Sequence, residues 1–259
     1  MRLVLFDLDD TLAPDEEAAA AAFLATARVA ATRHPVDAAR LAGDARTRAR
    51  ELWRAAPTSS YCTRVGISSW EGLWCGFAGD APPVRALRRW APTYRRQAWR
   101  RALADQGVCD HGLAEELAER FVGERRVRQR PFDDVPAALA GLAGSYRLAV
   151  VTNGASCLQR EKLDYAGLAD RFDVIVVSAD VGVGKPDPAV FRHALQRLGA
   201  ANGRAVMVGD SLARDVDGAE AAGLAAIWVN RARRPRPDGR RMLVEIRSLA
   251  ELAGALARV

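Results

Sequence analysis

The sequence predicts an α/β protein with a Rossmann-like parallel sheet core and an inserted all-α cap domain. Short, continuous runs of Val, Ile and Leu alternate with stretches of helical pattern, as in a parallel sheet that helices cover on both faces. About 140 residues without a comparable run separate the first strand from the second, which is far longer than an ordinary crossover connection. We therefore expect a separate helical domain after the first strand.

The core elements are predicted from their apolar runs and from the spacing of apolar residues. Strands are expected at 3–6, 148–152, 174–178, 205–208 and 225–229, with a sixth, shorter one at 243–246. Helices are expected at 136–143 and 249–257. Residues 1–14 and 131–259 thus form the predicted core domain.

Residues 15–130 are predicted to form the cap. Acidic residues suited to a helix N-terminus open the stretch 15–33, and further helices are expected at 36–55 and 112–127. Prolines are expected to divide the remainder into shorter pieces, at Pro57, Pro82, Pro83 and Pro92.

Composition excludes several classes of protein. With 259 residues, 49% hydrophobic and 27% charged, the chain has the composition of a globular protein and not of a fibre or a disordered tail. No window approaches the roughly 18 consecutive apolar residues of a membrane-spanning helix. An acidic cluster stands where a secretory signal needs its apolar core, which predicts a cytoplasmic protein. The four cysteines are too widely spaced for a zinc site or a disulfide framework, and we expect free thiols.

Arginine replaces lysine almost everywhere in this chain. The formal net charge is +6, and of the 38 basic residues only Lys162 and Lys185 are lysines. A position that keeps lysine against this background is a candidate for chemistry that the broad guanidinium group cannot perform. Lys185 is that candidate, whereas Lys162 is expected on a helix surface.

Polar or acidic residues follow four of the predicted strands. Ligands of an open parallel sheet bind beyond the carboxyl ends of its strands, so these four groups are expected to meet at one site. They are Asp7-Leu8-Asp9-Asp10-Thr11, Thr152-Asn153-Gly154, Gly184-Lys185-Pro186, and Gly209-Asp210-Ser211 with Asp215.

Three carboxylates of this set suit a magnesium ion. Asp7, Asp9 and Asp210 offer hard oxygen ligands, and Mg²⁺ takes a few such ligands together with water and phosphate oxygens. Neither imidazole nor thiolate occurs among the four groups, which argues against zinc and copper. Magnesium is therefore the expected cofactor.

The remaining groups suit an anionic substrate. Thr152 offers a hydroxyl donor, the backbone N–H groups of Asn153 and Gly154 open a helix and form an anion cradle, and Lys185 adds a compact positive charge. Together these groups are suited to a phosphate.

Hydrolysis of a phosphate monoester is among the slowest uncatalysed reactions. A carboxylate nucleophile divides it into formation and hydrolysis of an aspartyl-phosphate, and a second carboxyl can protonate the leaving alcohol and then activate water. Asp7 and Asp9 fit these two roles.

The four groups resemble the motifs of the haloacid dehalogenase-like superfamily, specifically its phosphatase branch with a helical cap inserted after the first motif. The resemblance covers most of the chain. It runs through residues 6–12, 151–154, 182–188 and 208–211, and on to Asp215, Ala219 and Ala222-Gly223.

The resemblance implies a role for each acidic residue. Asp7 would be the nucleophile and a magnesium ligand, and Asp9 would be the general acid/base whose backbone carbonyl binds the metal. Asp210 would be the third protein ligand, and Asp215 would orient this shell.

The same resemblance implies that Thr152 and Asn153 hold the phosphoryl group and that Lys185 binds it together with the carboxylate of Asp7. The haloacid dehalogenases of the superfamily lack an acid two positions after the nucleophile, so Asp9 favours phosphoryl transfer. The phosphonate hydrolases need a cap lysine, and the predicted cap contains none.

We therefore expect a phosphoric monoester hydrolase that acts on a small phosphorylated metabolite, namely a sugar or acyl-sugar phosphate or a nucleoside monophosphate. A membrane partner is not expected. Two alternatives stay open: a phosphomutase of the same fold, and a non-catalytic, basic nucleic-acid-binding or regulatory protein. The basic segment 231–241 would suit a nucleic-acid arm, but no aromatic residue interleaves with its charges, which favours an exposed loop.

Overall fold

The computed structural model describes residues 2–200, 205–236, 239 and 243–259, and the chain divides into two compact units. The core unit comprises Met1–Pro14, Arg130–Asn153 and Leu163–Val259, and the helical unit comprises Asp15–Gln129 and Gly154–Lys162.

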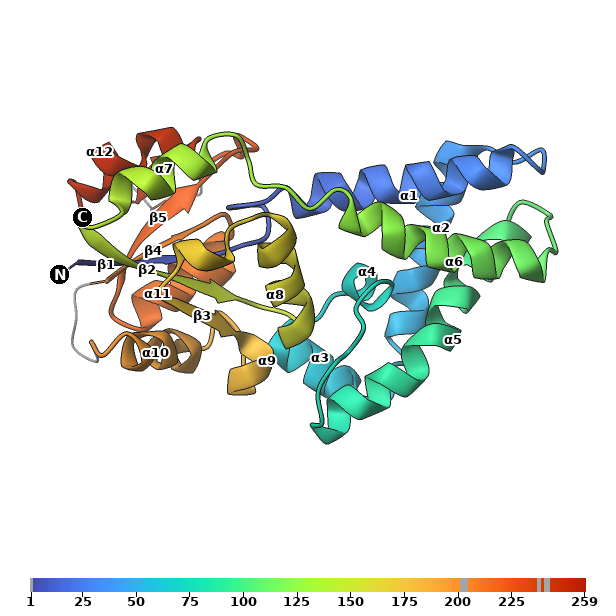
Figure 1. Cartoon of the computed structure of the whole chain (residues 1–259), viewed down its shortest axis with the longest axis horizontal. Coiled ribbons are helices and arrows are strands. Elements are labelled where there is room, and N and C mark those ends of the chain that lie inside the picture. Colours follow the sequence, from blue (N-terminus) through green and yellow to red (C-terminus); the bar gives the residue numbers. More distant parts are fainter. Residues whose placement is uncertain (1, 201–204, 237–238, 240–242) are drawn as a thin grey trace. The chain divides into compact units, whose positions relative to one another are not determined.

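The core unit is built on a six-stranded parallel sheet (Figure 1). The strands are β1 (Arg2–Phe6), β2 (Tyr146–Thr152), β3 (Val174–Val177), β4 (Ala205–Gly209), β5 (Ala225–Val229) and β6 (Val244–Ile246). Their order is β3-β2-β1-β4-β5-β6, so the order reverses at β1, which pairs with β2 on one side and β4 on the other. This Rossmann-like order confirms the predicted fold class, and each strand lies within two residues of its predicted bounds.

Helices cover both faces of this sheet. One face carries α7 (Val135–Leu142), the 3-10 turn η3 (Leu249–Glu251) and α12 (Leu252–Leu256), and the other carries α10 (Pro188–Arg197) and α11 (Asp217–Ala221). The shorter elements of the core unit are η1 (Ala169–Arg171), α9 (Ser178–Val181) and a single π-helical turn, η2 (Leu212–Val216).

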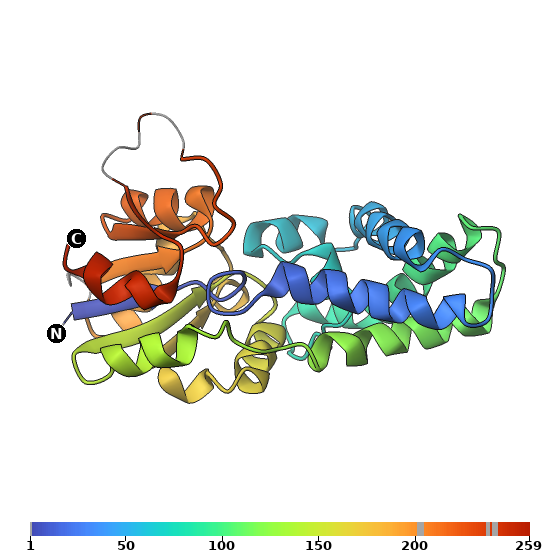
Figure 2. The ribbon, with the colours of Figure 1, turned by 90° about the horizontal axis from the view of Figure 1, so that it is seen from above.

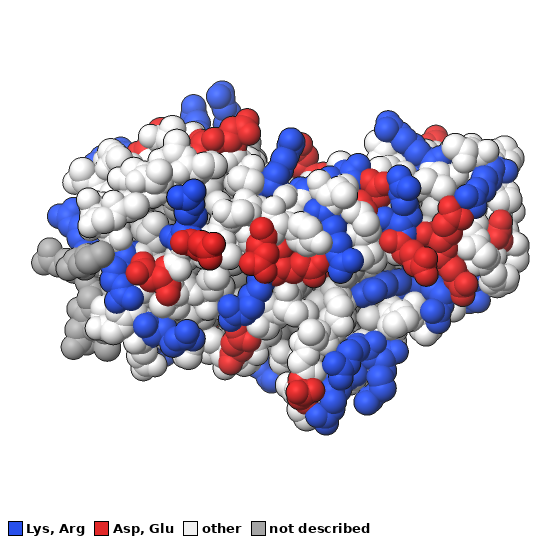
Figure 3. Space-filling model, in the orientation of Figure 1, with Lys and Arg blue, Asp and Glu red and all other residues white. Residues whose placement is uncertain are grey.

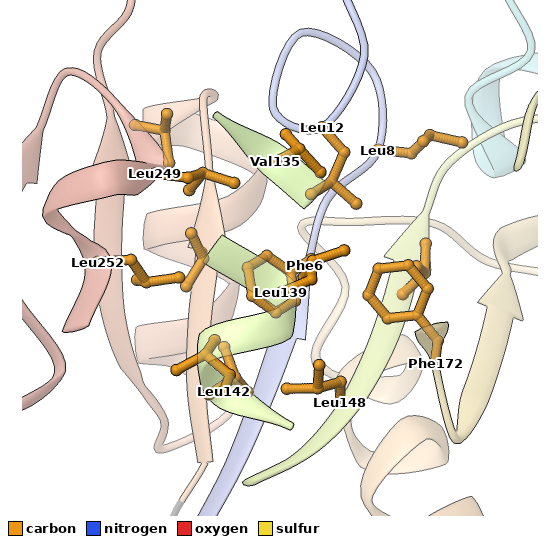
Figure 4. Close-up of a cluster of buried hydrophobic side chains, with 14 of the residues drawn as sticks. Phe6, Leu8, Leu12, Val135, Leu139, Leu142, Leu148, Phe172, Leu249 and Leu252 are labelled. Atoms are coloured by element: carbon orange, nitrogen blue, oxygen red, sulfur yellow. The ribbon is translucent and has the colours of Figure 1, made fainter. Parts of the chain in front are cut away.

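Side chains of each strand alternate between these two faces. In β1, Val4 and Phe6 belong to the cluster under α7 and α12, whereas Leu3 and Leu5 belong to the cluster under α10. Figure 4 shows the first cluster, with Phe6 close to Leu139 of α7. Burial on both faces explains why the strands read as continuous apolar runs.

The helical unit is built on four long helices. They are α1 (Asp15–Ala31), α2 (Ala38–Trp53), α5 (Pro82–Ala104) and α6 (His111–Arg126). The short α3 (Ser59–Val65) and α4 (Ser69–Gly72) lie between α2 and α5 in the chain. Helices α1 and α5 each pack against both α2 and α6, and Figure 2 shows α1 running alongside α6. The rings of Phe23, Trp99 and Phe121 contact one another between these helices, and all three side chains are buried in the core of the unit.

The longest helix continues through a proline that the sequence analysis expected at a break. Pro92 lies inside α5, where it lacks the N–H that would bond to the carbonyl of Arg88, a loss that costs about 3 kcal/mol in a helix interior. Both residues are exposed, so water can satisfy that carbonyl. Buried side chains on the opposite face, among them Leu87 and Tyr94, hold the helix together across the interruption.

Lys162, expected on a helix surface, is instead buried in the helical unit. It lies on α8 (Ser156–Tyr165), and its Nζ is 3.1 Å from the carboxylate of Asp15 and 3.4 Å from that of Glu71. Arg125 is also buried and pairs with Asp15. Buried charges require partners of opposite sign. These ion pairs explain why residues 154–162, assigned to the core domain from the sequence, group with the helical unit.

Basic side chains gather on the surface of the helical unit, and Figure 3 shows them over part of α5. This helix carries Arg85, Arg88, Arg89, Arg95, Arg96, Arg100 and Arg101.

None of the helices in the described part of the chain combines the length and apolar character that a membrane crossing requires.

The basic segment 231–241 lies partly outside the described residues, but its first residue is anchored in the core unit. The Arg231 guanidinium donates to both carboxylate oxygens of Asp134 at 2.9 Å and to the carbonyl of Thr11, and it lies 3.9 Å from the ring centroid of Phe132. Arg231 therefore links the loop after β1 to the segment that leads into α7.

Replacement of Asp134 by asparagine is expected to lower the free energy of unfolding by about 1–3 kcal/mol at neutral pH. The amide cannot form the two-oxygen pair with Arg231 while also accepting from the hydroxyl of Ser248 and the N–H of Leu249. Urea denaturation of the Asp134→Asn variant measures this loss, and Asp133→Asn, at an exposed neighbour, is the matched control.

The effect of that substitution should depend on pH. Burial raises the pKa of Asp134, but the hydrogen bonds from Arg231, Ser248 and Leu249 outweigh it and hold the pKa below its ordinary value of 3.8. A carboxylate with a lowered pKa stabilises the fold above its ordinary pKa, and this contribution is lost as the pH falls through the lowered value. The difference between wild type and Asp134→Asn should therefore shrink below about pH 4. An equal difference at pH 7 and at about pH 3 would contradict this assignment.

Candidate active site

The loop after β1 places Asp7 at the carboxyl end of a central strand. Its N–H donates to the carbonyl of Val208 at 2.9 Å, which continues the pairing of β1 with β4 beyond the strand. The chain then turns tightly, since the carbonyl of Leu8 accepts three successive N–H groups and Asp10 has a φ of 61°. Aspartate tolerates this left-handed conformation better than most residues. The turn leaves Asp7 buried and Asp9 half-buried.

The ammonium group of Lys185 lies between two buried carboxylates. Its Nζ is 2.6 Å from Oδ1 of Asp7 and 2.6 Å from Oδ1 of Asp215, and all three side chains are buried. Burial alone would lower the pKa of Lys185, but the charges of Asp215 and Asp7 outweigh it and raise that pKa above its ordinary value. Lys185 is therefore a permanent cation at neutral pH.

The same burial acts on the carboxylate of Asp7. Desolvation raises the pKa of Asp7, and the nearby charge of Lys185 counteracts part of this rise.

Asn153, which follows β2, fixes the backbone of Lys185. Its side-chain oxygen accepts the N–H of Lys185 at 2.8 Å, and its side-chain amide donates to the Lys185 carbonyl at 2.9 Å. A Cβ at Gly184 would lie 2.7 Å from Oδ1 of Asn153, so the close approach requires glycine there. The buried Thr152 hydroxyl lies 3.5 Å from the Asn153 carbonyl. The end of β2 and the segment that carries Lys185 are thus held together.

Asp210 is held through its backbone, which leaves its carboxylate available. Its N–H donates to the hydroxyl of Thr11 at 3.0 Å, and its carbonyl accepts from Nε1 of Trp228 at 2.8 Å. Within the described part of the chain, its buried Oδ1 has no hydrogen-bond partner. A buried carboxylate oxygen without a donor is unfavourable unless a proton or a cation binds it.

The carboxylate cluster fits a divalent cation. Oxygens of Asp7, Asp210 and Asp215 lie within 4.8 Å of one another. Burial, followed by the charges of Asp7 and Asp215, raises the pKa of Asp210 to about 7. Asp215 already pairs with Lys185 and accepts a backbone N–H at 2.9 Å. Asp7 and Asp210 are therefore the carboxylates suited to Mg²⁺. The orienting role of Asp215 and the contribution of the Asp9 backbone carbonyl stay predictions.

A second cation lies close to this cluster. The chain after Asp210 enters the π-helical turn η2, in which the hydroxyl of Ser211 accepts the N–H of Arg214 at 3.3 Å. Burial lowers the pKa of Arg214, but the charges of Asp7 and Asp215 outweigh it and raise that pKa. No role was assigned to Arg214 from the sequence, because an arginine in so arginine-rich a chain carries no signal of its own.

The structure brings the residues predicted for the site to one edge of the sheet. They are Asp7 and Asp9 after β1, Thr152 and Asn153 at the end of β2, Lys185 before α10, and Asp210 and Asp215 after β4. Their chemical roles remain predictions.

Two features of the site differ from the sequence analysis. The N–H of Gly154 donates to the carbonyl of Val65 at 3.1 Å within the helical unit, so the expectation that it forms part of an anion cradle is wrong. Thr11 and Trp228 orient the backbone of Asp210, and neither role was assigned. The spacing of Thr11 from Asp7 in the first motif was a signal for it, whereas Trp228 stands in an apolar run without one.

The chain is similar to known hydrolases over most of its length. A sequence model described as haloacid dehalogenase-like hydrolase matches residues 1–223. The chain is 40% identical over 240 residues to a phosphoserine phosphatase of Thermus thermophilus, and this match covers 91% of each protein.

Two solved structures are similar over essentially the whole chain. A 2-haloacid dehalogenase of Pseudomonas syringae is 30% identical with a TM-score of 0.62, and the match covers 100% of this chain and 99% of that one. A HAD phosphatase of Thermococcus onnurineus is 30% identical with a TM-score of 0.56, and the match covers 100% of both chains.

Substitution of Gly209 by alanine is expected to disturb the Lys185 pairing. A Cβ at this position would lie 2.4 Å from Cγ of Asp215, so the carboxylate must move away from Lys185. We expect the free energy of unfolding of Gly209→Ala to fall by about 1–3 kcal/mol in thermal or urea denaturation.

Gly141→Ala is the matched control. A Cβ added at residue 141 would have no atom within 4 Å, and alanine has a higher helix propensity than glycine within α7. Wild-type stability of Gly209→Ala would show that the close approach at Gly209 has no energetic consequence.

Proposed function

The chain belongs to the haloacid dehalogenase-like hydrolase family and is a phosphatase of that family, and we propose that it hydrolyses a small phosphorylated metabolite with the help of Mg²⁺. The reaction would proceed through a phosphoryl group held covalently on Asp7. One observation carries the proposal: a buried Asp7 carboxylate lies against the Lys185 ammonium, beside a buried Asp210 oxygen without a partner among the described residues. A purely structural ion pair has no need of that third group.

Asp7 and Lys185 would perform the transfer together. The Asp7 carboxylate attacks phosphorus, and the ammonium group 2.6 Å away offsets negative charge on the transferring phosphoryl group. Asp215 holds Lys185 from the other side, so the cation is in place before substrate binds. A cation that is already in place does not have to reorient during the reaction, whereas water molecules around the phosphoryl group would have to.

Asp9 would handle the protons. As an acid it protonates the oxygen of the leaving alcohol, and as a carboxylate it then removes a proton from the water that attacks the aspartyl-phosphate. The Thr152 hydroxyl and the Asn153 N–H would bind phosphoryl oxygens. Held by Asp7 and Asp210, Mg²⁺ would supply further charge neutralisation to the phosphoryl group.

The substrate class can be tested with a panel. The similarity to a phosphoserine phosphatase over 91% of each protein supports phosphoserine as the first compound, beside sugar and acyl-sugar phosphates and nucleoside monophosphates. Inorganic phosphate should be released from at least one of these compounds in the presence of Mg²⁺, and release should cease with a chelator. Release that is indifferent to the chelator would contradict the metal assignment.

Hydrolysis of a haloacid is the second candidate, because a 2-haloacid dehalogenase is similar over the whole chain. Asp9 argues against it, since that reaction releases a halide, which needs no proton. Incubation with 2-chloropropionate should release no chloride. Chloride release faster than phosphate release would reverse the ranking of the two functions.

Asp7→Asn is expected to lower phosphatase turnover by about 10³-fold or more, because an amide oxygen is a poor nucleophile. Phosphate release from p-nitrophenyl phosphate and from the best panel compound measures the loss. Asp164→Asn changes an exposed carboxylate of the core unit and should retain full activity. Substantial turnover by Asp7→Asn would assign the nucleophile elsewhere.

Asp9→Asn is expected to slow hydrolysis of alkyl phosphates by about 10²- to 10³-fold, because an alkoxide leaves poorly without a proton. With p-nitrophenyl phosphate the nitrophenolate group leaves without protonation, so only the second step, hydrolysis of the aspartyl-phosphate, should be slow. Rapid mixing should then show a burst of nitrophenolate followed by slow turnover. Equal slowing of every step for both substrates, with no burst, would argue against the acid/base role.

A further inference from the structure

Two cysteines that are 82 residues apart in the chain meet in the helical unit. The Sγ atoms of Cys75 and Cys157 lie 3.7 Å apart, close enough for a hydrogen bond between the thiols. Cys75 follows α4, and Cys157 is the second residue of α8; both helices can be located in Figure 1. We propose that this pair is a reversible dithiol–disulfide modification site that a hydroperoxide oxidises.

Two successive backbone N–H groups point at the two sulfur atoms. The N–H of Phe77 donates to Sγ of Cys75 at 3.3 Å, and the N–H of Ala78 donates to Sγ of Cys157 at 3.3 Å. Phe77 is buried and has a φ of 49°, a conformation that a bulky side chain rarely adopts. Successive N–H groups around a left-handed residue form a concavity that binds anions. The segment after α4 is therefore shaped to stabilise negative charge on sulfur.

The electrostatic surroundings favour a thiolate on Cys157. The hydrogen bond from Cys75 is the largest cause that lowers the pKa of Cys157, to about 6, against burial and the charge of Glu161, which raise it. Cys157 also lies in the first turn of α8, where the helix dipole favours an anion. Glu161 pairs with Arg126 at 2.7 Å, which reduces its effect on the thiolate.

The two cysteines differ in a way that assigns each a part. Cys157 is half-buried, whereas Cys75 is buried and burial raises the pKa of its thiol. The more accessible and more acidic thiol reacts first with an oxidant, and the protonated, buried thiol stays in reserve. Cys157 is thus the attacking residue and Cys75 the resolving residue.

The reaction balances with hydrogen peroxide as the oxidant. The Cys157 thiolate attacks one peroxide oxygen, the O–O bond breaks, and hydroxide leaves and takes up a proton to become water. The sulfenic acid on Cys157 is then attacked by the sulfur of Cys75. The S–O bond breaks, a second hydroxide takes the thiol proton and leaves as water, and the S–S bond forms. The two thiols lose two electrons in total, and both go to the peroxide.

Peptide mass spectrometry of the full-length protein tests the proposal. The reduced protein is treated with hydrogen peroxide, free thiols are alkylated, and the chain is digested with trypsin without reduction. A cross-linked pair of peptides, residues 65–85 and 148–160, should appear with a loss of two hydrogen atoms and should vanish after dithiothreitol. Absence of that pair at peroxide concentrations that oxidise the exposed Cys109 would overturn the proposal.

Three variants separate a built site from chance proximity. Cys75→Ser should accumulate a sulfenic acid on residue 157 that dimedone traps, and Cys157→Ser should yield neither the sulfenic acid nor the cross-link. Cys109→Ser, at an exposed thiol, should form the cross-link as fast as wild type. Dimedone labelling of Cys75 in the Cys157→Ser variant would reverse the assigned parts, and so contradict the mechanism. These readouts do not involve phosphatase activity, so the proposed function is tested separately.

Discussion

The core unit depends on a buried ammonium group that two carboxylates share. Lys185, Asp7 and Asp215 come from three distant parts of the chain, and all three are buried. Burial of any one of these charges without its partners would strongly destabilise the fold. Their mutual contact fixes the end of β1, the turn after β4 and the segment before α10 relative to one another. The glycines at 184 and 209 follow from this constraint, because a Cβ at either place would collide with a residue that holds Lys185.

The same rule governs the helical unit and explains both lysines of the chain. Lys162 lies between the carboxylates of Asp15 and Glu71, as Lys185 lies between two others. A compact ammonium group fits between two carboxylates, whereas a planar guanidinium suits a two-oxygen pair such as that of Arg231 with Asp134. Retention of lysine in an arginine-rich chain therefore marks a buried cation with two partners. We propose a catalytic role for only one of the two, Lys185.

The sequence predicted what repeats locally and missed what depends on tertiary contact. The strands were recognisable because burial on both faces makes each a continuous apolar run, and the site residues because polar groups follow those runs. The contact of Trp228 with Asp210 depends on the register of β5 against β4, which pairs Trp228 with Gly209 and is not encoded in either run. The meeting of Cys75 with Cys157 and the burial of Lys162 likewise require the folded helical unit. The break predicted at Pro92 was wrong, because the sequence alone does not show that Pro92 lies on the exposed face of α5.

The distribution of hydrogen bonds differs between the cluster around Asp210 and a structural acidic cluster. A structural cluster satisfies its polar atoms, as Asp134 does with Arg231, Ser248 and Leu249. Asp210 is held as firmly, but through its backbone N–H and carbonyl, so its position is fixed without using its carboxylate. Burial, and after it the repulsion from Asp7 and Asp215, raises the pKa of Asp210, and a bound cation would relieve this repulsion. A carboxylate that its backbone fixes in place, with an oxygen that has no hydrogen-bond partner among the described residues, is suited to bind a cation.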